Sequence, residues 1–156
     1  MGGGLVLELR DLAATHGLAA RLAGLLRGGD VVALRGDLGA GKTEFARALI
    51  RARAGSPLEV PSPTFTIMQD YPLDGLTIRH IDLYRIADPD ELFELGLEET
   101  PAEDEAWLVE WPDRAAGRLA GTCLSLALEE GDSPDARIAR LTGDAFWTSR
   151  LPALAP

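Results

Sequence analysis

The chain has 156 residues, a net charge of −10, 46% apolar residues and a mean hydropathy of +0.02. This length suits one domain covering residues 1–156, with its core at about 5–142, and the apolar share is enough to build a buried interior. The acidic charge argues against unaided binding of nucleic acid, which needs a basic surface, and no apolar run reaches the roughly 18 residues that span a bilayer.

The first third of the chain predicts two strands and two helices. Residues 5–9 alternate weakly between apolar and polar side chains, which indicates a short edge strand. Residues 11–27 carry leucines at helical spacing, and the glycine pair 28–29 ends that helix. The apolar run 31–34 predicts a buried strand. A glycine-rich loop follows it, and residues 42–53 then predict a second helix.

The rest of the chain predicts shorter elements. Strands are expected at 64–68, 77–83, 107–109, 122–128 and 136–141, with short helices at 88–95 and 112–119. The strand pairs within 64–83 and 122–141 follow one another without an intervening helix, whereas the other strands alternate with helices. The pattern therefore predicts an α/β fold with a mixed central sheet flanked by helices.

The loop between the first buried strand and the second helix matches the phosphate-binding pattern G-x-x-x-x-G-K-[ST]. It reads Gly36-Asp37-Leu38-Gly39-Ala40-Gly41-Lys42-Thr43, and Lys42 is the only lysine among the 15 basic residues. A chance match in a glycine-rich loop would not explain why strand, helix and lone lysine all agree. The order of glycines is not that of a dinucleotide-binding turn.

Each part of this loop has a predicted role in binding a nucleotide. Backbone N–H groups and the helix N-terminus should surround the phosphates. Lys42 should reach the β- and γ-phosphates, and the Thr43 hydroxyl should bind Mg²⁺. The predicted nucleotide-binding residues of the loop are Leu38, Gly39, Ala40, Gly41, Lys42 and Thr43.

Two acids at predicted strand ends, Asp82 and Glu110, are candidates to complete the site. An ATPase with this loop needs carboxylates to hold Mg²⁺, directly or through water, and to orient the attacking water. Spacing does not decide which acid does which. His80 lies two residues before Asp82 and shares its face of the strand. It is expected to be packed and hydrogen-bonded rather than a proton carrier, and Trp111 is expected to pack rather than to be an exposed contact.

The segment Pro61-Ser62-Pro63-Thr64-Phe65-Thr66 follows the second helix. A hydroxyl or backbone N–H of Ser62 or Thr64 could sense the γ-phosphate, as a switch segment does. The alternative is a rigid turn made by the two prolines.

Four separated motifs together resemble the TsaE family, bacterial P-loop ATPases needed to make threonylcarbamoyladenosine in tRNA. They are the phosphate loop at 36–43, Ser62-Pro63-Thr64-Phe65-Thr66, His80-Ile81-Asp82-Leu83-Tyr84-Arg85 and Val109-Glu110-Trp111-Pro112. The resemblance runs from about Leu12 to Leu141, and the ordered set of four is far more specific than the loop alone.

The resemblance implies a P-loop NTPase fold and roles for several residues. Thr43 and Glu110 would ligate Mg²⁺, Asp82 would be the second essential acid, and Lys42, Asp82 and Glu110 would be the catalytic residues. Thr15 would lie near the adenine end of the nucleotide. Arg137 is a further candidate to approach the base.

The resemblance also implies partners. The chain would use ATP and Mg²⁺ while acting with the proteins TsaD and TsaB, would meet tRNA only through that complex, and would make no membrane contact. A cytoplasmic location fits the lone cysteine, which excludes an internal disulfide.

Two other functions stay open at this point. A small-molecule kinase can use the same loop, and an acceptor-dependent phosphorylated product would identify it. A nucleotide-gated binding module would bind ATP tightly without releasing phosphate, even with partners present. No arginine-rich lid segment follows the loop, which favours the ATPase.

Overall fold

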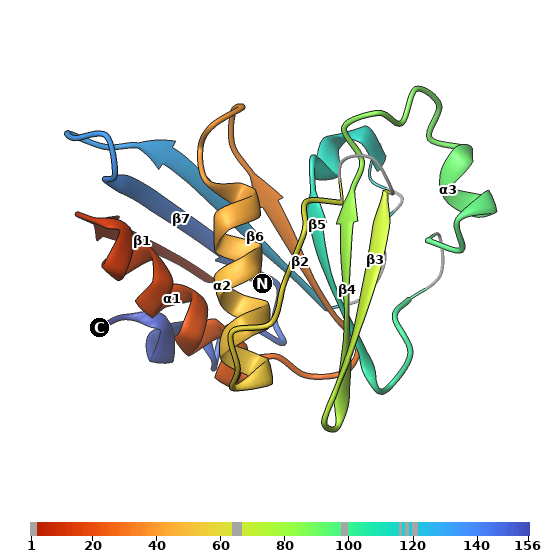
Figure 1. The fold of residues 1–156 in the computed structure, drawn as a ribbon, viewed down its shortest axis with the longest axis horizontal. Helices are drawn as coiled ribbons and strands as arrows, with labels where there is room; N and C mark the ends of the chain where they lie inside the picture. Colours follow the sequence, from red (N-terminus) through yellow and green to blue (C-terminus); the bar gives the residue numbers. More distant parts are fainter. Residues whose placement is uncertain (1–2, 64–66, 98–99, 116, 118, 120–121) are drawn as a thin grey trace.

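One mixed sheet organises the part of the chain that the structure describes, residues 3–63, 67–97, 100–115, 117, 119 and 122–156. In this computed structural model the strands lie in the order β1-β7-β6-β2-β5-β4-β3 (Figure 1). Their bounds are β1 Gly3–Leu9, β2 Asp30–Arg35, β3 Met68–Leu73, β4 Leu76–Asp82, β5 Glu105–Glu110, β6 Thr122–Glu130 and β7 Arg137–Gly143. The four central strands run parallel, whereas β1, β7 and β3 pair antiparallel with their neighbours. The predicted mixed sheet is confirmed.

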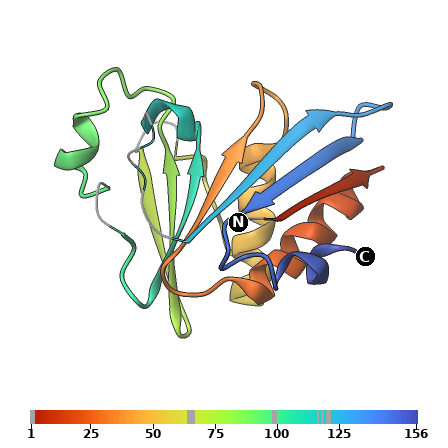
Figure 2. The same ribbon diagram turned by 180° about the vertical axis from the view of Figure 1, so that it is seen from behind.

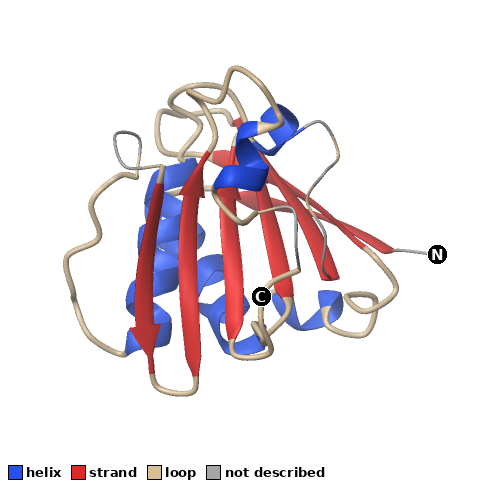
Figure 3. Cartoon of the chain, turned by 90° about the vertical axis from the view of Figure 1, so that its right-hand side faces the viewer, coloured by secondary structure: helices blue, strands red, loops and turns tan. Residues whose placement is uncertain are grey.

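Two long helices, α1 (Leu12–Leu25) and α2 (Lys42–Ala54), cover one face of the sheet (Figures 2 and 3). The Asp11 carboxylate caps α1 by accepting a hydrogen bond from the backbone N–H of Ala14 at 2.8 Å. At the end of α2, Gly55 has a φ of 68°, the left-handed conformation that glycine adopts without strain. None of the helices within the described ranges combines the length and apolar content that a bilayer crossing requires.

The strand β2 is buried on both faces, as its unbroken apolar run predicts. Val32 and Leu34 pack into the larger hydrophobic cluster, which includes the inner faces of α1 and α2. Val31 joins a smaller cluster with Ile81 of β4 and Val109 of β5. Since β2 is held from both sides, the loop that follows it starts from a fixed point.

The parallel strands β2, β5 and β4 end at the same edge of the sheet. In the strand register Leu34 of β2 lies beside Glu110 of β5, and Glu110 lies beside Asp82 of β4. This edge is where the carboxyl ends of parallel strands present ligand-binding residues in α/β proteins.

Three predicted elements differ from the structure. The strand expected at 64–68 is misplaced: residues 64–66 lie outside the described residues, Ile67 has a φ of 68° that no strand residue adopts, and β3 begins at Met68. The helix expected at 112–119 is a short 3₁₀ helix, Pro112–Ala115, as far as the described residues show. The helix expected at 88–95 is reduced to α3, Glu91–Glu94.

A buried ion pair ties the C-terminal segment to the start of β2. The guanidinium of Arg150 donates to both carboxylate oxygens of Asp30, at 2.8 and 3.0 Å, and both residues are no more than 5% exposed. Arg150 also stacks on the Trp147 ring, with its guanidinium carbon 3.6 Å from the ring centroid. The segment that follows, Leu151–Leu154, then packs as a 3₁₀ helix.

We expect Arg150→Met to lower the free energy of unfolding by about 3–5 kcal/mol, because it leaves the Asp30 carboxylate buried without its cation. Denaturant unfolding measures the change. The matched control is Arg140→Met, whose guanidinium pairs with Glu129 on the surface and should contribute at most about 1 kcal/mol. Equal losses in the two variants would contradict the proposed importance of the buried pair.

Candidate functional site

The loop between β2 and α2 is shaped by glycines whose backbone conformation would strain other residues. Gly36, Gly39 and Gly41 all have positive φ values, of 146°, 82° and 102°. At Gly36 an added Cβ would lie 2.7 Å from the carbonyl oxygen of Leu128 and 2.9 Å from the Cβ of Ala40, so a side chain does not fit. The loop therefore turns back tightly onto the N-terminus of α2.

Lys42, the first residue of α2, points back over this loop. It is 5% exposed, and its ammonium donates to the carbonyl oxygens of Gly36 at 2.5 Å and Asp37 at 3.0 Å. Its Nζ atom also lies 4.1 Å from the centroid of the Trp111 ring. Burial lowers the pKa of Lys42, while the carboxylates of Glu110, Asp82 and Asp37 act in the opposite direction.

Glu110 ends β5 and faces the first turn of α2. Its Oε1 atom accepts a hydrogen bond from the Thr43 hydroxyl at 2.7 Å, and its Oε2 atom lies 2.7 Å from Nε2 of His80. Glu110 is 2% exposed and His80 is fully buried. The strand ends bring the two acids together, since Asp82 lies beside Glu110 in the register of β4 and β5. The Oδ1 atom of Asp82 accepts a hydrogen bond from the backbone N–H of Tyr84 at 2.9 Å.

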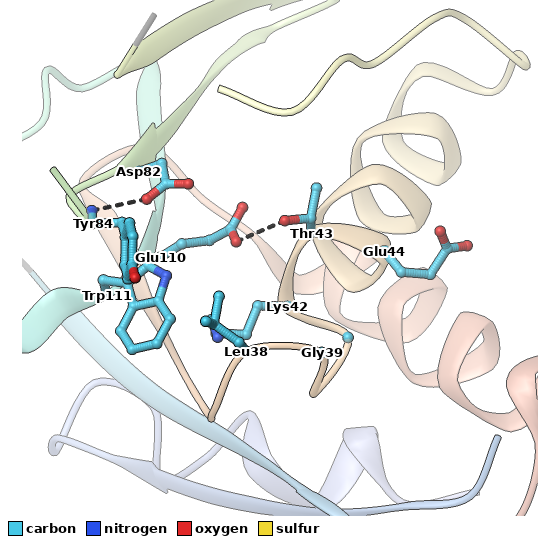
Figure 4. A pocket seen from close by; sticks show the side chains of 10 residues that line it. Leu38, Gly39, Lys42, Thr43, Glu44, Asp82, Tyr84, Glu110 and Trp111 are labelled. Atoms are coloured by element: carbon cyan, nitrogen blue, oxygen red, sulfur yellow. Dashed lines mark hydrogen bonds between the residues drawn. The ribbon is translucent and has the colours of Figure 1, made fainter. Parts of the chain in front are cut away.

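A cavity of about 320 Å³ lies between the loop and the ends of β4 and β5. Figure 4 shows Asp82, Glu110 and Thr43 around it, with Trp111 and Tyr84 on one side and Leu38 next to Lys42. Its lining consists of Leu38, Gly39, Gly41, Lys42, Thr43, Glu44, Asp82, Tyr84, Glu110 and Trp111. It thus combines a cation, two carboxylates and the N-terminus of α2, which suits a phosphate chain with its metal ion.

The Thr43 and Glu110 oxygens fit a shared Mg²⁺ ion. Two ligands at neighbouring corners of a Mg²⁺ octahedron lie about 2.9 Å apart when each bond is about 2.0–2.1 Å long. The 2.7 Å between Thr43 Oγ1 and Glu110 Oε1 is close to that spacing. Within the described residues there is no cluster of three or more His, Cys, Asp or Glu side chains suited to a metal. The Thr43 hydroxyl and the Glu110 carboxylate are oxygen donors of the kind that Mg²⁺ prefers.

The other predicted site residues lie outside this lining. Thr15 is buried in α1, with its hydroxyl 3.5 Å from the carbonyl oxygen of Asp11. The next residue, His16, bonds Glu44 at 2.8 Å and so places this turn of α1 beside the start of α2. Contact of Thr15 with the adenine end stays a prediction. Ser62 is partly buried and does not line the cavity, and Thr64 lies outside the described residues.

Trp111 packs as expected, against the smaller hydrophobic cluster, and it also contacts the lysine of the loop. It has a φ of 57°, a strained conformation for a residue with a side chain, and such strain collects at functional sites. Its ring lies 5.0 Å from that of Tyr84 and over the Lys42 ammonium. Trp111 therefore forms one wall of the cavity, against the lysine.

Arg137 of β7 braces the phosphate loop from behind, a contact that no motif predicted. Its Nε donates to the carbonyl oxygen of Ala40 at 2.8 Å and its Nη2 to that of Gly39 at 3.3 Å. The remaining donors reach the carbonyls of Pro134 and Ala136. In a trans peptide the N–H points away from the C=O, so holding the Ala40 carbonyl also orients the Gly41 N–H.

Arg137→Met is expected to weaken binding of both ATP and inorganic tripolyphosphate by about tenfold, since two or more charge-assisted hydrogen bonds to the loop are lost. Isothermal titration calorimetry compares the two ligands. Arg140→Met, three residues further along β7, is the control. If ATP binding weakens while tripolyphosphate binding does not, Arg137 acts on the base and not on the loop.

Known proteins resemble this chain in sequence and in structure. The family model described as "Threonylcarbamoyl adenosine biosynthesis protein TsaE" matches residues 9–139. Two relatives named "tRNA threonylcarbamoyladenosine biosynthesis protein TsaE" come from Rickettsia conorii and Rickettsia bellii. They are 40% and 36% identical, over 76% and 83% of this chain and 67% and 89% of their own lengths. A third, from Aquifex aeolicus, is 43% identical over 64% of this chain and 71% of its own length.

A solved structure supports the fold. The structure described as "Crystal structure of Bacillus subtilus YdiB" superposes with a TM-score of 0.74 and 27% identity, covering 97% of this chain and 93% of that one. Together with the strand–loop–helix unit at residues 30–54, this similarity confirms the predicted P-loop NTPase fold.

Proposed function

The chain belongs to the TsaE family of threonylcarbamoyl adenosine biosynthesis proteins, and we propose that it is a Mg²⁺-dependent ATPase that supports this modification of tRNA. The modified base would be the adenosine next to the anticodon, and the chain would act with TsaD and TsaB. The observation that carries the ATPase proposal is the convergence of Lys42, Thr43 and Glu110 around one cavity behind a glycine loop.

Binding of the phosphates would replace contacts that the loop makes with itself. In the structure the Lys42 ammonium contacts two loop carbonyls and the Trp111 ring. A β- or γ-phosphate oxygen offers the ammonium a full negative charge in a partly desolvated site, which is a stronger partner than a neutral carbonyl. The backbone N–H groups of the loop and the first turn of α2 would hold the other phosphate oxygens.

The two carboxylates would have separate roles, one in binding the metal and one in orienting water. Both oxygens of Glu110 already have partners, Thr43 on one side and His80 on the other, which suits a fixed metal ligand. Asp82 lines the same cavity at the end of the neighbouring strand, and we assign it the orientation of the attacking water. Mg²⁺, held by Thr43 and Glu110, would offset the negative charge of the phosphates.

Hydrolysis by the isolated chain should be slow. The described residues that line the cavity include no arginine that could stabilise charge on the γ-phosphate in the transition state. TsaD or TsaB would either supply such a group or order the segment around Ser62 and Thr64. The net charge of −10 fits a chain that meets tRNA only through these partners. We place the chain in the cytoplasm, away from membranes.

A reconstituted modification reaction tests this function. We expect that TsaD and TsaB, supplied with ATP, tRNA and an activated threonylcarbamoyl donor, will give sustained formation of threonylcarbamoyladenosine only when this chain is added. Lys42→Ala should not support it. If the chain instead transfers phosphate to an added small-molecule acceptor and leaves the tRNA reaction unchanged, the kinase alternative is correct.

A further inference from the structure

We propose that His80 is a positioning residue that fixes the Glu110 carboxylate for metal binding, an inference that rests on the proposed Mg²⁺-dependent nucleotide site. His80 lies in β4, one strand away from Glu110, and is fully buried. It does not line the cavity, so it would act on the nucleotide only through Glu110.

Strand geometry places His80 directly behind the acid. Side chains alternate along β4, so His80 shares a face with Ile78 and Asp82, the face on which Ile78 packs into the cluster beneath α1 and α2. In the strand register His80 lies beside Leu108, two residues before Glu110. The imidazole therefore reaches diagonally along the sheet to the Glu110 side chain, where Nε2 and Oε2 are 2.7 Å apart.

The direction of this hydrogen bond follows from its partners. A carboxylate offers only lone pairs, so Nε2 of His80 carries the hydrogen and donates it to Oε2. The other ring nitrogen, Nδ1, is buried and has no hydrogen-bond partner among the described residues. A buried nitrogen left in this state costs free energy that an apolar side chain would avoid. The hydrogen bond to Glu110 is thus the one polar contact of the His80 side chain among the described residues.

The two contacts of Glu110 fix its carboxylate plane. One oxygen meets the Thr43 hydroxyl and the other meets His80, so rotation about the last side-chain bond would break both bonds. With Oε2 held from behind, Oε1 is kept on the Thr43 side, where the metal would bind. In many metal sites a ligating carboxylate or imidazole is held by a second partner in this way. Removing that partner commonly lowers the metal affinity of the site about 10–100-fold.

The test compares three variants of His80 by calorimetric titration with ADP, in Mg²⁺ and in EDTA. His80→Gln places an amide N–H where Nε2 was, His80→Met has a similar length without a donor, and His80→Asn carries its amide one bond too short. The measured quantity is the ratio of ADP affinity in Mg²⁺ to that in EDTA. This ratio reports the metal and not the fold.

We expect His80→Met and His80→Asn to lower this ratio by about tenfold or more, while ADP affinity in EDTA stays within about twofold of the parent. His80→Gln should keep most of the ratio. If His80→Met does not fold, the Gln and Asn pair carries the same comparison. A ratio unchanged in the variants that lack the donor, or lowered equally in His80→Gln, overturns the positioning role. A parent chain whose ADP affinity does not depend on Mg²⁺ overturns the proposed metal-dependent function, and this inference with it.

Discussion

Replacing Lys42 with alanine is expected to weaken ATP binding by at least about 100-fold, because the site loses its one ammonium group over the phosphates. Lys42 is the only lysine in the chain, and it is the only basic side chain among the described residues that line the cavity. Calorimetric titration of the parent and the variant with ATP and Mg²⁺ measures the loss.

The fold should survive this change. Burial lowers the pKa of Lys42, because a partly desolvated ammonium is less favourable than one in water. Removing the ammonium relieves that cost but leaves the Gly36 and Asp37 carbonyls without their donor, so we expect the thermal midpoint to stay within a few degrees. Lys42→Arg should also fail to bind, since a planar guanidinium does not fit where a compact ammonium reaches two loop carbonyls. Normal ATP binding by either variant would contradict the assignment of the site.

Glu110→Gln is expected to reduce ATP hydrolysis by about 100-fold or more and to remove most of its dependence on Mg²⁺. The variant keeps the size of the side chain but exchanges a charged metal ligand for a neutral amide. Phosphate release measured against Mg²⁺ concentration reports both effects. The control is Glu129→Gln on β6, whose carboxylate pairs with Arg140 on the surface.

Comparing Asp82→Asn with Glu110→Gln distinguishes the roles of the two acids. If Asp82 orients water, this variant should lose turnover while its nucleotide affinity keeps the Mg²⁺ dependence of the parent. Glu110→Gln should lose both. The reverse pattern, with Mg²⁺ dependence lost in Asp82→Asn and kept in Glu110→Gln, would exchange the roles that we propose for the two carboxylates.

The parts of the fold next to the site were predictable because their signals are local. The apolar run 31–34, the glycines of the loop and the helical spacing that follows each depend on a few neighbouring residues, and the structure places β2 and α2 within two residues of the predicted bounds. Asp82 and Glu110 could be paired because both follow apolar runs, and parallel strands end at one edge.

The contacts that hold the site together were not predictable, because they join residues distant in sequence. Arg137 reaches Ala40 across 97 positions, and Arg150 reaches Asp30 across 120. Both depend on the strand order, in which β7 lies between β1 and β6, and no local pattern gives that order. His80 was correctly expected to be hydrogen-bonded, but the identity of its partner needed the register of β4 and β5.

The misplaced start of β3 has a local cause that composition hides. Ile67 is β-branched, which favours a strand, yet its φ of 68° breaks the extended backbone. Its N–H donates to the carbonyl of Pro63 and its carbonyl accepts from the N–H of Asp82. These bonds, one within the segment and one to β4, override the residue's own preference, so the strand begins at Met68.

The most direct measurement is ATP hydrolysis by the purified chain, alone and with TsaD and TsaB, with Lys42→Ala in parallel. The proposed function predicts slow phosphate release by the chain alone, a clear increase when the partners are added, and no release above background in the variant. Fast hydrolysis without partners would contradict the proposed need for a group that the partners supply or order. Phosphate release that is the same in Lys42→Ala as in the parent would contradict the nucleotide site itself.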